Sequence, residues 1–139
     1  MPTLFTKIVN REIPANIVAE DDEFLAFLDI RPIVIGHTLV IPKQEIVYVL
    51  DIEDELLGRM MAFSKKVAQA LKDVTNAKRI GFAASGFEIP HAHIHLCPIN
   101  VTSEMACTNP PLPVTNEELC SLAMKIRECY VHLNRNPTV

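Results

Sequence analysis

Residues 91–96 read His91-Ala92-His93-Ile94-His95-Leu96 and contain three of the five histidines in the chain. In an extended strand, side chains alternate between the two faces, so the three imidazoles are expected on one face, with neighbours about 6.6 Å apart. Ala92, Ile94 and Leu96 then point to the opposite face, into the core. The pattern predicts a strand over residues 93–99, with a solvent-facing row of histidines and an apolar opposite face.

Three kinds of chemistry can account for a row of imidazoles. A purely structural row is the weakest explanation, because imidazoles gain little from burial. Neutral imidazole is a common zinc ligand, and Glu88 is the nearby carboxylate that could complete a metal site. A neutral imidazole can also attack phosphorus while a protonated neighbour donates to an oxygen or a leaving group. We favour nucleophilic catalysis and keep metal binding as the alternative.

Hydrophobic periodicity predicts short strands on both sides of one long helix. Apolar residues at spacings of three and four indicate a helix over residues 51–74, with Asp51 as its N-cap. Thr115 and Glu118 have the spacing of a capping box and precede a C-terminal amphipathic helix. This order favours an α+β fold, a mostly antiparallel five-stranded sheet with one long helix and a C-terminal helix. The expected strands are 16–19, 23–29, 37–41, 79–84 and 93–99, and residues 4–9 form a short helix or an extended segment.

The composition limits the kind of protein this can be. The chain has 139 residues, 49% of them hydrophobic, and a net charge of −4. This size predicts a single domain over residues 1–139. Charged residues of both signs are mixed along the chain, which argues against general nucleic-acid binding, because that needs a dense basic surface. No segment approaches the roughly 20 apolar residues of a membrane helix.

The cysteines and glycines further restrict the class of protein that the chain can be. None of the four cysteines forms a C-x-x-C pair, which favours reduced thiols and a cytoplasmic location. The four glycines make no G-x-x-x-x-G-K loop. A kinase or motor ATPase is therefore not expected.

Four ordered segments give the chain a resemblance to the histidine triad (HIT) hydrolases. Residues 91–96 resemble the family signature. FTKIV at 5–9 with EIPA at 12–15, LAFLDI at 25–30 and GHTLVIPK at 36–43 look like its other segments, in the expected order. The resemblance covers about residues 4–100 and is closest to the Hint branch, small homodimeric purine nucleoside phosphoramidases. Residues 101–139, a loop and the C-terminal helix, lie outside it.

The resemblance implies a role for each matching residue. His93 would be the nucleophile that carries the nucleotidyl group, and His95 would contact the α-phosphate and help to protonate the leaving group. His91 and His37 would support the other imidazoles and fix their tautomers. Asp29 would accept hydrogen bonds from the ribose hydroxyls. The slot for the base would be formed by Phe5, Ile8, Phe27 and Ile30.

The chain departs from the family pattern at two places. Phe87 occupies a glutamine position and Glu88 a serine position, so Glu88 becomes a candidate nucleotide contact whose charge opposes an anion. Some relatives bind zinc through cysteines near the N-terminus, where this chain has Thr3 and Thr6. We therefore expect no metal at that position and no cofactor in the reaction.

These observations predict a homodimeric nucleotide hydrolase or transferase. Its substrates would be purine nucleoside phosphoramidates or related AMP conjugates, cleaved at the α-phosphate through a nucleotidyl-histidine intermediate. A dinucleoside polyphosphate hydrolase and a nucleotide-binding regulatory protein with vestigial activity are the alternatives. A second apolar ridge on the long helix, at Leu57, Met61 and Ala68, favours the homodimer.

Overall fold

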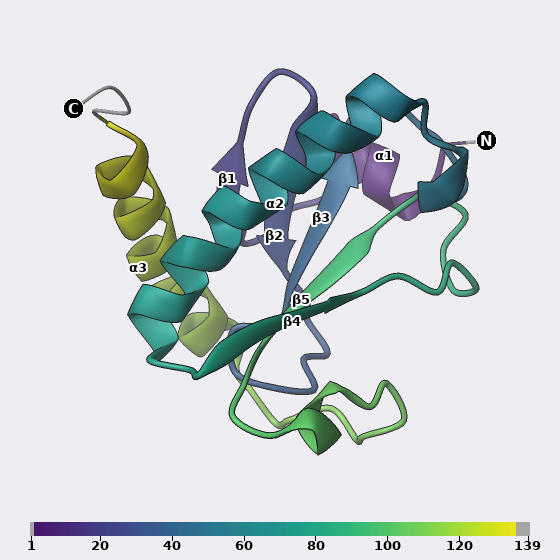
Figure 1. Ribbon diagram of the computed structural model, residues 1–139. Coiled ribbons are helices and arrows are strands. Elements are labelled where there is room, and N and C mark those ends of the chain that lie inside the picture. Colours follow the sequence, from purple (N-terminus) through teal and green to yellow (C-terminus); the bar gives the residue numbers. More distant parts are fainter. Residues whose placement is uncertain (1, 136–139) are drawn as a thin grey trace.

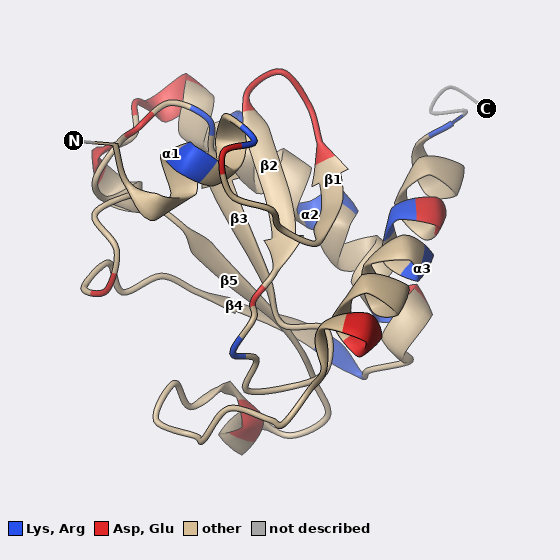
Figure 2. Ribbon diagram, turned by 180° about the vertical axis from the view of Figure 1, so that it is seen from behind, with Lys and Arg blue, Asp and Glu red and all other residues tan. Residues whose placement is uncertain are grey.

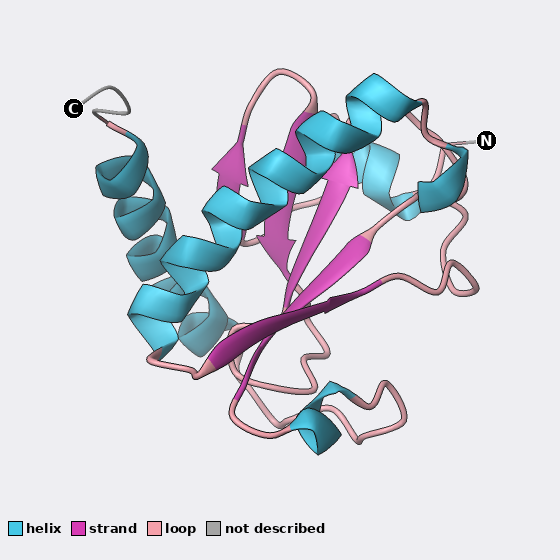
Figure 3. Ribbon diagram, in the orientation of Figure 1, coloured by secondary structure: helices cyan, strands magenta, loops and turns pink. Residues whose placement is uncertain are grey.

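The computed structural model describes residues 2–135 and has the α+β fold that the sequence predicts (Figures 1 and 3). Two single turns of 3-10 helix, η1 (Val49–Asp51) and η2 (Thr102–Met105), accompany the main elements. The main elements in chain order are α1 (Leu4–Val9), β1 (Ile17–Glu20), β2 (Phe24–Leu28), β3 (Thr38–Pro42), α2 (Asp54–Thr75), β4 (Arg79–Ala83), β5 (Ile94–Ile99) and α3 (Asn116–Asn134).

The five strands form one antiparallel sheet in the order β1-β2-β3-β5-β4. Strands β1 and β4 are therefore the edges of the sheet. In β5, His95 lies opposite Leu39 of β3 and Ala83 of β4. This register places His95 between two neighbouring strands, while the chain before Ile94 lies outside the ladder.

Helices cover both faces of the sheet. Helices α2 and α3 pack on one face and α1 on the other, as the opposite views in Figures 1 and 2 show. The side chains of β3 alternate accordingly: Val40 joins the core beneath α2, and Leu39 and Ile41 join the smaller cluster beneath α1. Ala92, Ile94 and Leu96 belong to the core beneath α2, as the alternation of the histidine segment predicts.

The predicted N-cap is correct for α3 and wrong for α2. Thr115 Oγ1 accepts a hydrogen bond from the backbone N–H of Glu118 at 3.1 Å, which confirms the capping box. The prediction that Asp51 caps the long helix is wrong. Glu53 is the N-cap and accepts from the backbone N–H of Leu56 at 2.9 Å. Asp51 instead ends η1, and the extended backbone at Ile52 delays the start of α2.

Charged residues of both signs are scattered along the ribbon, and a run of acidic residues occupies the β1–β2 turn (Figure 2). The four cysteines lie within the described residues and are unpaired. Among residues 2–135, no helix combines the length and the apolar character needed to cross a membrane.

Candidate functional site

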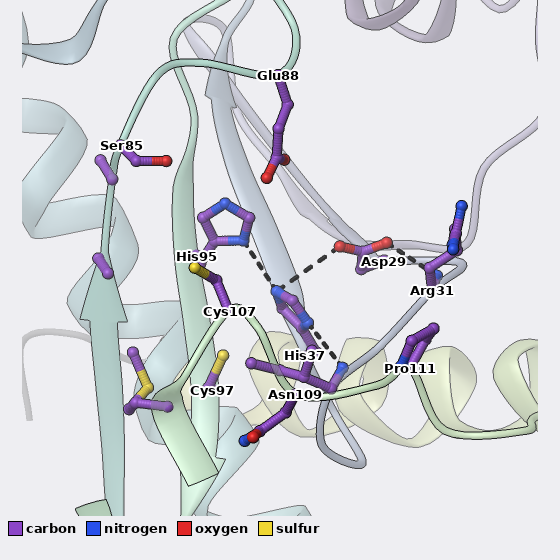
Figure 4. Close-up of a pocket in the computed structure, with 14 residues that line it drawn as sticks. Asp29, Arg31, His37, Ser85, Glu88, His95, Cys97, Cys107, Asn109 and Pro111 are labelled. Atoms are coloured by element: carbon purple, nitrogen blue, oxygen red, sulfur yellow. Dashed lines mark hydrogen bonds and ion pairs between the residues drawn. The ribbon is translucent and has the colours of Figure 1, made fainter. Parts of the chain in front are cut away.

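Two cavities meet at His95. The first, called here the apolar slot, has a volume of about 290 Å³ and lies between α1 and the sheet. The second, called the loop-side cavity, has a volume of about 480 Å³ and is lined partly by the segment between β5 and α3 (Figure 4). Both are lined by Asp29, Arg31, Glu88 and His95.

The apolar slot brings together the four apolar residues assigned to it from the sequence. The rings of Phe5 and Phe27 pack edge to face with centroids 5.5 Å apart, and both side chains are buried. Ile8 is buried beside them, whereas Ile30 is 72% exposed and lies at the mouth. The sequence analysis missed Leu39, which also lines the slot. Aromatic and aliphatic walls of this kind suit a planar apolar ligand.

Two hydrogen bonds fix the tautomers of His37 and His95. The backbone N–H of Ile33 donates to His37 Nδ1 at 3.2 Å, so the proton of the neutral His37 ring is on Nε2. His37 Nε2 lies 2.9 Å from His95 Nδ1 and donates to it (Figure 4). The proton of the neutral His95 ring is therefore on Nε2, which leaves an N–H group available to a ligand.

Burial keeps these rings uncharged near neutral pH. Loss of solvation lowers the pKa of His37 to about 4, although the nearby Asp29 carboxylate acts in the opposite direction. Loss of solvation also lowers the pKa of His95, and the neighbouring His93 adds to that effect. The neutral tautomers deduced from the hydrogen bonds are therefore the relevant ones in the free protein.

His93 is held through its own backbone neighbour. Its Nδ1 lies 2.8 Å from the carbonyl oxygen of His91, and a carbonyl only accepts, so Nδ1 carries the proton. The lone pair of the neutral ring is consequently on Nε2. The rings of His93 and His95 are 5.0 Å apart between centroids. His93 Nε2, which has a free lone pair, thus belongs to a ring that lies beside His95, whose Nε2 offers an N–H group.

The prediction of a solvent-facing histidine row is wrong. His91 is 0% exposed and His93 is 4% exposed, because Phe5 of α1 packs against both rings at centroid distances of 5.8 and 5.2 Å. Strand β5 also begins at Ile94, one residue later than predicted, so only His95 of the three lies within it. His91 and His93 are therefore buried and His95 is half-buried. His93 lines the apolar slot, His95 lines both cavities, and His91 lines neither.

The side chain of His91 contacts backbone and hydroxyl groups rather than the other imidazoles. Its Nε2 donates to the carbonyl oxygen of Pro42 at 2.8 Å, and its Nδ1 lies 2.8 Å from Thr3 Oγ1. Loss of solvation lowers the pKa of His91, so the ring is neutral. Any effect of His91 on the tautomer of His93 comes through its backbone carbonyl.

The two carboxylates of the site differ in how they are held. Asp29 Oδ1 accepts from the backbone N–H of Arg31 at 2.9 Å, and Oδ2 lies 3.7 Å from His37 Nε2. This turn fixes Asp29 at the junction of the cavities. Glu88 is exposed, and in Figure 4 its carboxylate points toward the space beside His95.

Comparison with known proteins agrees with this geometry. The HIT domain pattern matches residues 10–100. The chain belongs to the HIT family. It is 40% identical over 102 residues to an uncharacterized HIT-like protein of Borreliella burgdorferi, an alignment that covers 68% of this chain and 73% of that one.

Two further relatives of the HIT protein are informative. The adenosine 5′-monophosphoramidase HNT1 of Saccharomyces cerevisiae is 38% identical over 96 residues, which cover 68% of this chain and 61% of the yeast protein. The crystal structure of a hypothetical histidine triad nucleotide-binding protein from Sulfolobus tokodaii superposes with a TM-score of 0.84 at 30% identity. That superposition covers 96% of this chain and 95% of the other.

The HIT protein has two groups of side chains with metal-ligand chemistry among its described residues. In each of two triplets, Asp29–His37–His95 and Glu88–His93–His95, the ligand atoms lie within 4.8 Å of one another. A hydrogen bond between the rings of His37 and His95 already occupies the first triplet. The second combines two imidazoles and a carboxylate, ligand types that suit zinc.

The sequence analysis of the HIT protein missed a polar cluster formed by Thr3, Thr6 and Glu45. Thr6 Oγ1 donates to Glu45 Oε1 at 2.6 Å, and the backbone N–H of Thr3 donates to the same oxygen at 2.9 Å. The Thr3 hydroxyl also caps α1 and contacts His91. These bonds attach α1, which carries Phe5, to the chain beyond β3. The Thr-x-x-Thr spacing before an apolar run was the available signal, as an N-cap pattern.

Proposed function

We propose that this HIT protein binds AMP-like purine nucleotides and hydrolyses nucleoside phosphoramidates or related AMP conjugates at the α-phosphorus. The observation that carries the proposal is the hydrogen bond between His93 Nδ1 and the His91 carbonyl. Because that bond fixes a proton on Nδ1, Nε2 is the nitrogen through which the neutral His93 ring can attack phosphorus. The name of the yeast relative, an adenosine 5′-monophosphoramidase, supports the same substrate class.

In this proposal each part of the nucleotide has its own contact. The purine lies between the apolar walls of the slot, against Phe5 and Phe27. The free carboxylate oxygen of Asp29 accepts hydrogen bonds from the ribose hydroxyls, a charge-assisted contact. The α-phosphoryl group lies at the junction of the two cavities, next to the Nε2–H group of His95. Glu88 lies at the same junction and favours a substrate whose phosphoryl group carries little negative charge.

The proposed reaction has two displacement steps. In the first, His93 Nε2 forms a bond to phosphorus and the bond from phosphorus to the amine nitrogen breaks. The anionic phosphoryl group favours the protonated form of His95, which gives its proton to the departing amine. In the second, water attacks phosphorus as His95 takes a proton from it, and the bond to His93 breaks. The products are the nucleoside monophosphate and the free amine, and no metal takes part.

Trapping the intermediate tests this mechanism. Protein quenched during turnover of adenosine 5′-phosphoramidate should carry AMP on His93, in a linkage that is labile to acid and survives base. The matched control is His132→Ala, since His132 is an exposed histidine on α3 and should leave the trapped adduct unchanged. Turnover without an adduct on His93 would reject the covalent mechanism. AMP binding without turnover would instead favour the regulatory alternative.

We also propose that the protein is a homodimer that pairs at the β4 edge. Phe82 of β4 is 62% exposed and Met61 of α2 is 38% exposed. Together with Ala68 they line a hollow of about 440 Å³ between this edge and α2. Exposed apolar surface beside an unpaired strand edge favours contact with a second copy.

The oligomeric state can be checked by light scattering. The wild-type protein should have twice the 15.6 kDa mass of the chain, and Phe82→Glu should shift it toward the monomer. Phe87→Glu is the matched control, because Phe87 is 92% exposed and does not line the hollow. A wild-type protein that remains a monomer at micromolar concentration would contradict the proposal.

We further propose a cytoplasmic location. The four cysteines are unpaired, and two of them, Cys107 and Cys120, are exposed. Exposed free thiols persist in a reducing compartment.

Metal binding remains a second candidate because of one triplet, Glu88–His93–His95. A zinc ion there would occupy the nitrogen that our mechanism uses as nucleophile. Elemental analysis of the purified protein, together with turnover measured with and without chelator, separates the two. Metal at one equivalent per chain and loss of activity with chelator would favour the metal mechanism.

A further inference from the structure

The loop-side cavity is closed by a part of the chain outside the matched HIT domain. Met105, Cys107, Asn109 and Pro111 line it, and all four lie beyond residue 100, where the match ends. Backbone hydrogen bonding holds this segment in place: the N–H of Leu112 donates to the carbonyl of Pro32 at 2.7 Å. The loop between β5 and α3 is therefore a built wall of this cavity.

The position of the cavity relative to His93 suggests its role. His93 lines the slot and does not line the loop-side cavity, whereas His95 lines both. In a displacement at phosphorus, the attacking and leaving atoms are roughly in line on opposite sides. With His93 attacking from the slot side, the group that leaves points into the loop-side cavity.

The chemistry of the cavity walls restricts what can leave. The wall beyond His95 holds no Asp, Glu, Lys or Arg side chain, and much of it is apolar, with Ile33, Ala83 and Pro111. Burial raises the pKa of the Cys97 thiol in the same wall to about 12, so it is also neutral. The carboxylates of Asp29 and Glu88 lie where the two cavities meet, and Arg31 lies on the far side of Asp29 from His95 in Figure 4.

We propose that the loop-side cavity is a leaving-group site, and that it selects amines with an apolar body over polyphosphates. The inference rests on the proposed function and names the leaving group of the same reaction. A neutral or cationic amine meets apolar walls and the Glu88 carboxylate. A polyphosphate would bring several negative charges beside two carboxylates, with one arginine on the far side to offset them.

A panel of three adenosine compounds tests the selectivity of the wild-type protein. The compounds are the unsubstituted 5′-phosphoramidate, the phosphoramidate of 2-phenylethylamine, and diadenosine tetraphosphate. We expect kcat/KM to be highest for the phenylethylamine compound and at least tenfold lower for the tetraphosphate. A gap smaller than tenfold, or a preference for the tetraphosphate, overturns the inference.

A cavity-filling variant tests the position of the site. Cys107→Phe should lower the ratio of kcat/KM between the phenylethylamine and unsubstituted compounds at least tenfold. Cys120→Phe is the matched control, an exposed cysteine on α3 that lines neither cavity. If thermal melting shows that Cys107→Phe does not fold, Asn109→Phe on the same wall replaces it. A ratio that changes equally in variant and control overturns the inference.

The two proposals fail in different ways. If the wild-type protein turns over none of the three compounds, the proposed function is wrong. If it turns over the unsubstituted phosphoramidate but the ratio does not respond to Cys107→Phe, only the leaving-group site is wrong.

Discussion

The two cavities that meet at His95 are built from different kinds of structure. The inner walls of the apolar slot are core residues: Phe5 and Phe27 are each 4% exposed and contact one another. The loop-side cavity is closed by exposed or half-buried residues of a connecting loop, such as Cys107 and Asn109. Changing the slot therefore costs stability, whereas changing the loop wall costs little. The proposed nucleotide site is thus built from rigid core structure, and the cavity beside it from a loop that tolerates change.

The largest effect is expected at the junction itself. His93→Ala should lower turnover of adenosine 5′-phosphoramidate at least a thousandfold, because it removes the proposed nucleophile. AMP affinity should fall much less, since Phe5, Phe27 and Asp29 remain. Steady-state kinetics and calorimetric titration with AMP measure the two effects separately.

Because His93 is buried, thermal melting must accompany this variant. A folded His93→Ala protein with normal turnover would contradict the assignment. Equal loss of turnover and AMP affinity would mean that His93 acts only in binding the nucleotide within the slot. The proposed division of roles between the two cavities would then be wrong.

A smaller and more selective effect is expected for His95, which lines both cavities. His95→Ala removes the proposed proton donor for the leaving group but keeps the proposed nucleophile. Turnover should fall by about 10²–10⁴-fold for alkylamine leaving groups and much less for a nitrophenolate leaving group that needs no proton. The measurement is kcat/KM across leaving groups of graded basicity. An equal loss for all of them would assign His95 to binding.

The third prediction concerns His37, which lines the loop-side cavity, and the stability of the folded protein at low pH. The ring has a pKa of about 4 in the folded protein and about 6.5 in an unfolded chain. As the pH falls below 6.5, the unfolded chain binds the proton first, so the free energy of unfolding decreases until about pH 4. The expected decrease from this one ring is on the order of 3 kcal/mol.

Urea unfolding at pH 7, 5.5 and 4 provides the check. The pH dependence should be shallower in His37→Gln than in the wild-type protein, while His132→Gln, a change at an exposed histidine, should leave it unaltered. Parallel curves for wild type and His37→Gln would show that the buried ring is not the source of acid sensitivity.

The smallest effect is expected for Asp29, where the slot ends. Asp29→Ala should weaken AMP binding by about 1.5–3 kcal/mol, the usual contribution of a hydrogen bond to a charged group. The comparison ligand is 2′,3′-dideoxy-AMP, which lacks the hydroxyls. Wild type should lose affinity for this ligand and the variant should not. If both lose the same affinity, Asp29 does not contact the ribose.

Local patterns were sufficient to predict most of the fold. Alternation and helical periodicity placed the five strands and the two long helices to within a few residues. The start of α2 was missed because Asp is a preferred N-cap residue type, which favoured Asp51, whereas the structure uses Glu53. The choice between them depends on the turn η1, which the apolar pattern does not describe.

The sequence by itself determined that the histidines alternate with core residues and that Phe5, Phe27 and Asp29 accompany them in a recognisable order. Only the tertiary structure decided what each ring contacts. The hydrogen bond between Thr3 and His91 joins positions 88 residues apart, and that between His37 and His95 joins positions 58 apart. Periodicity specifies the face on which a side chain lies, but not which distant segment packs on that face. For this reason the burial of His91 and His93 beneath α1 and the cavity closed by the loop after β5 emerged only from the fold.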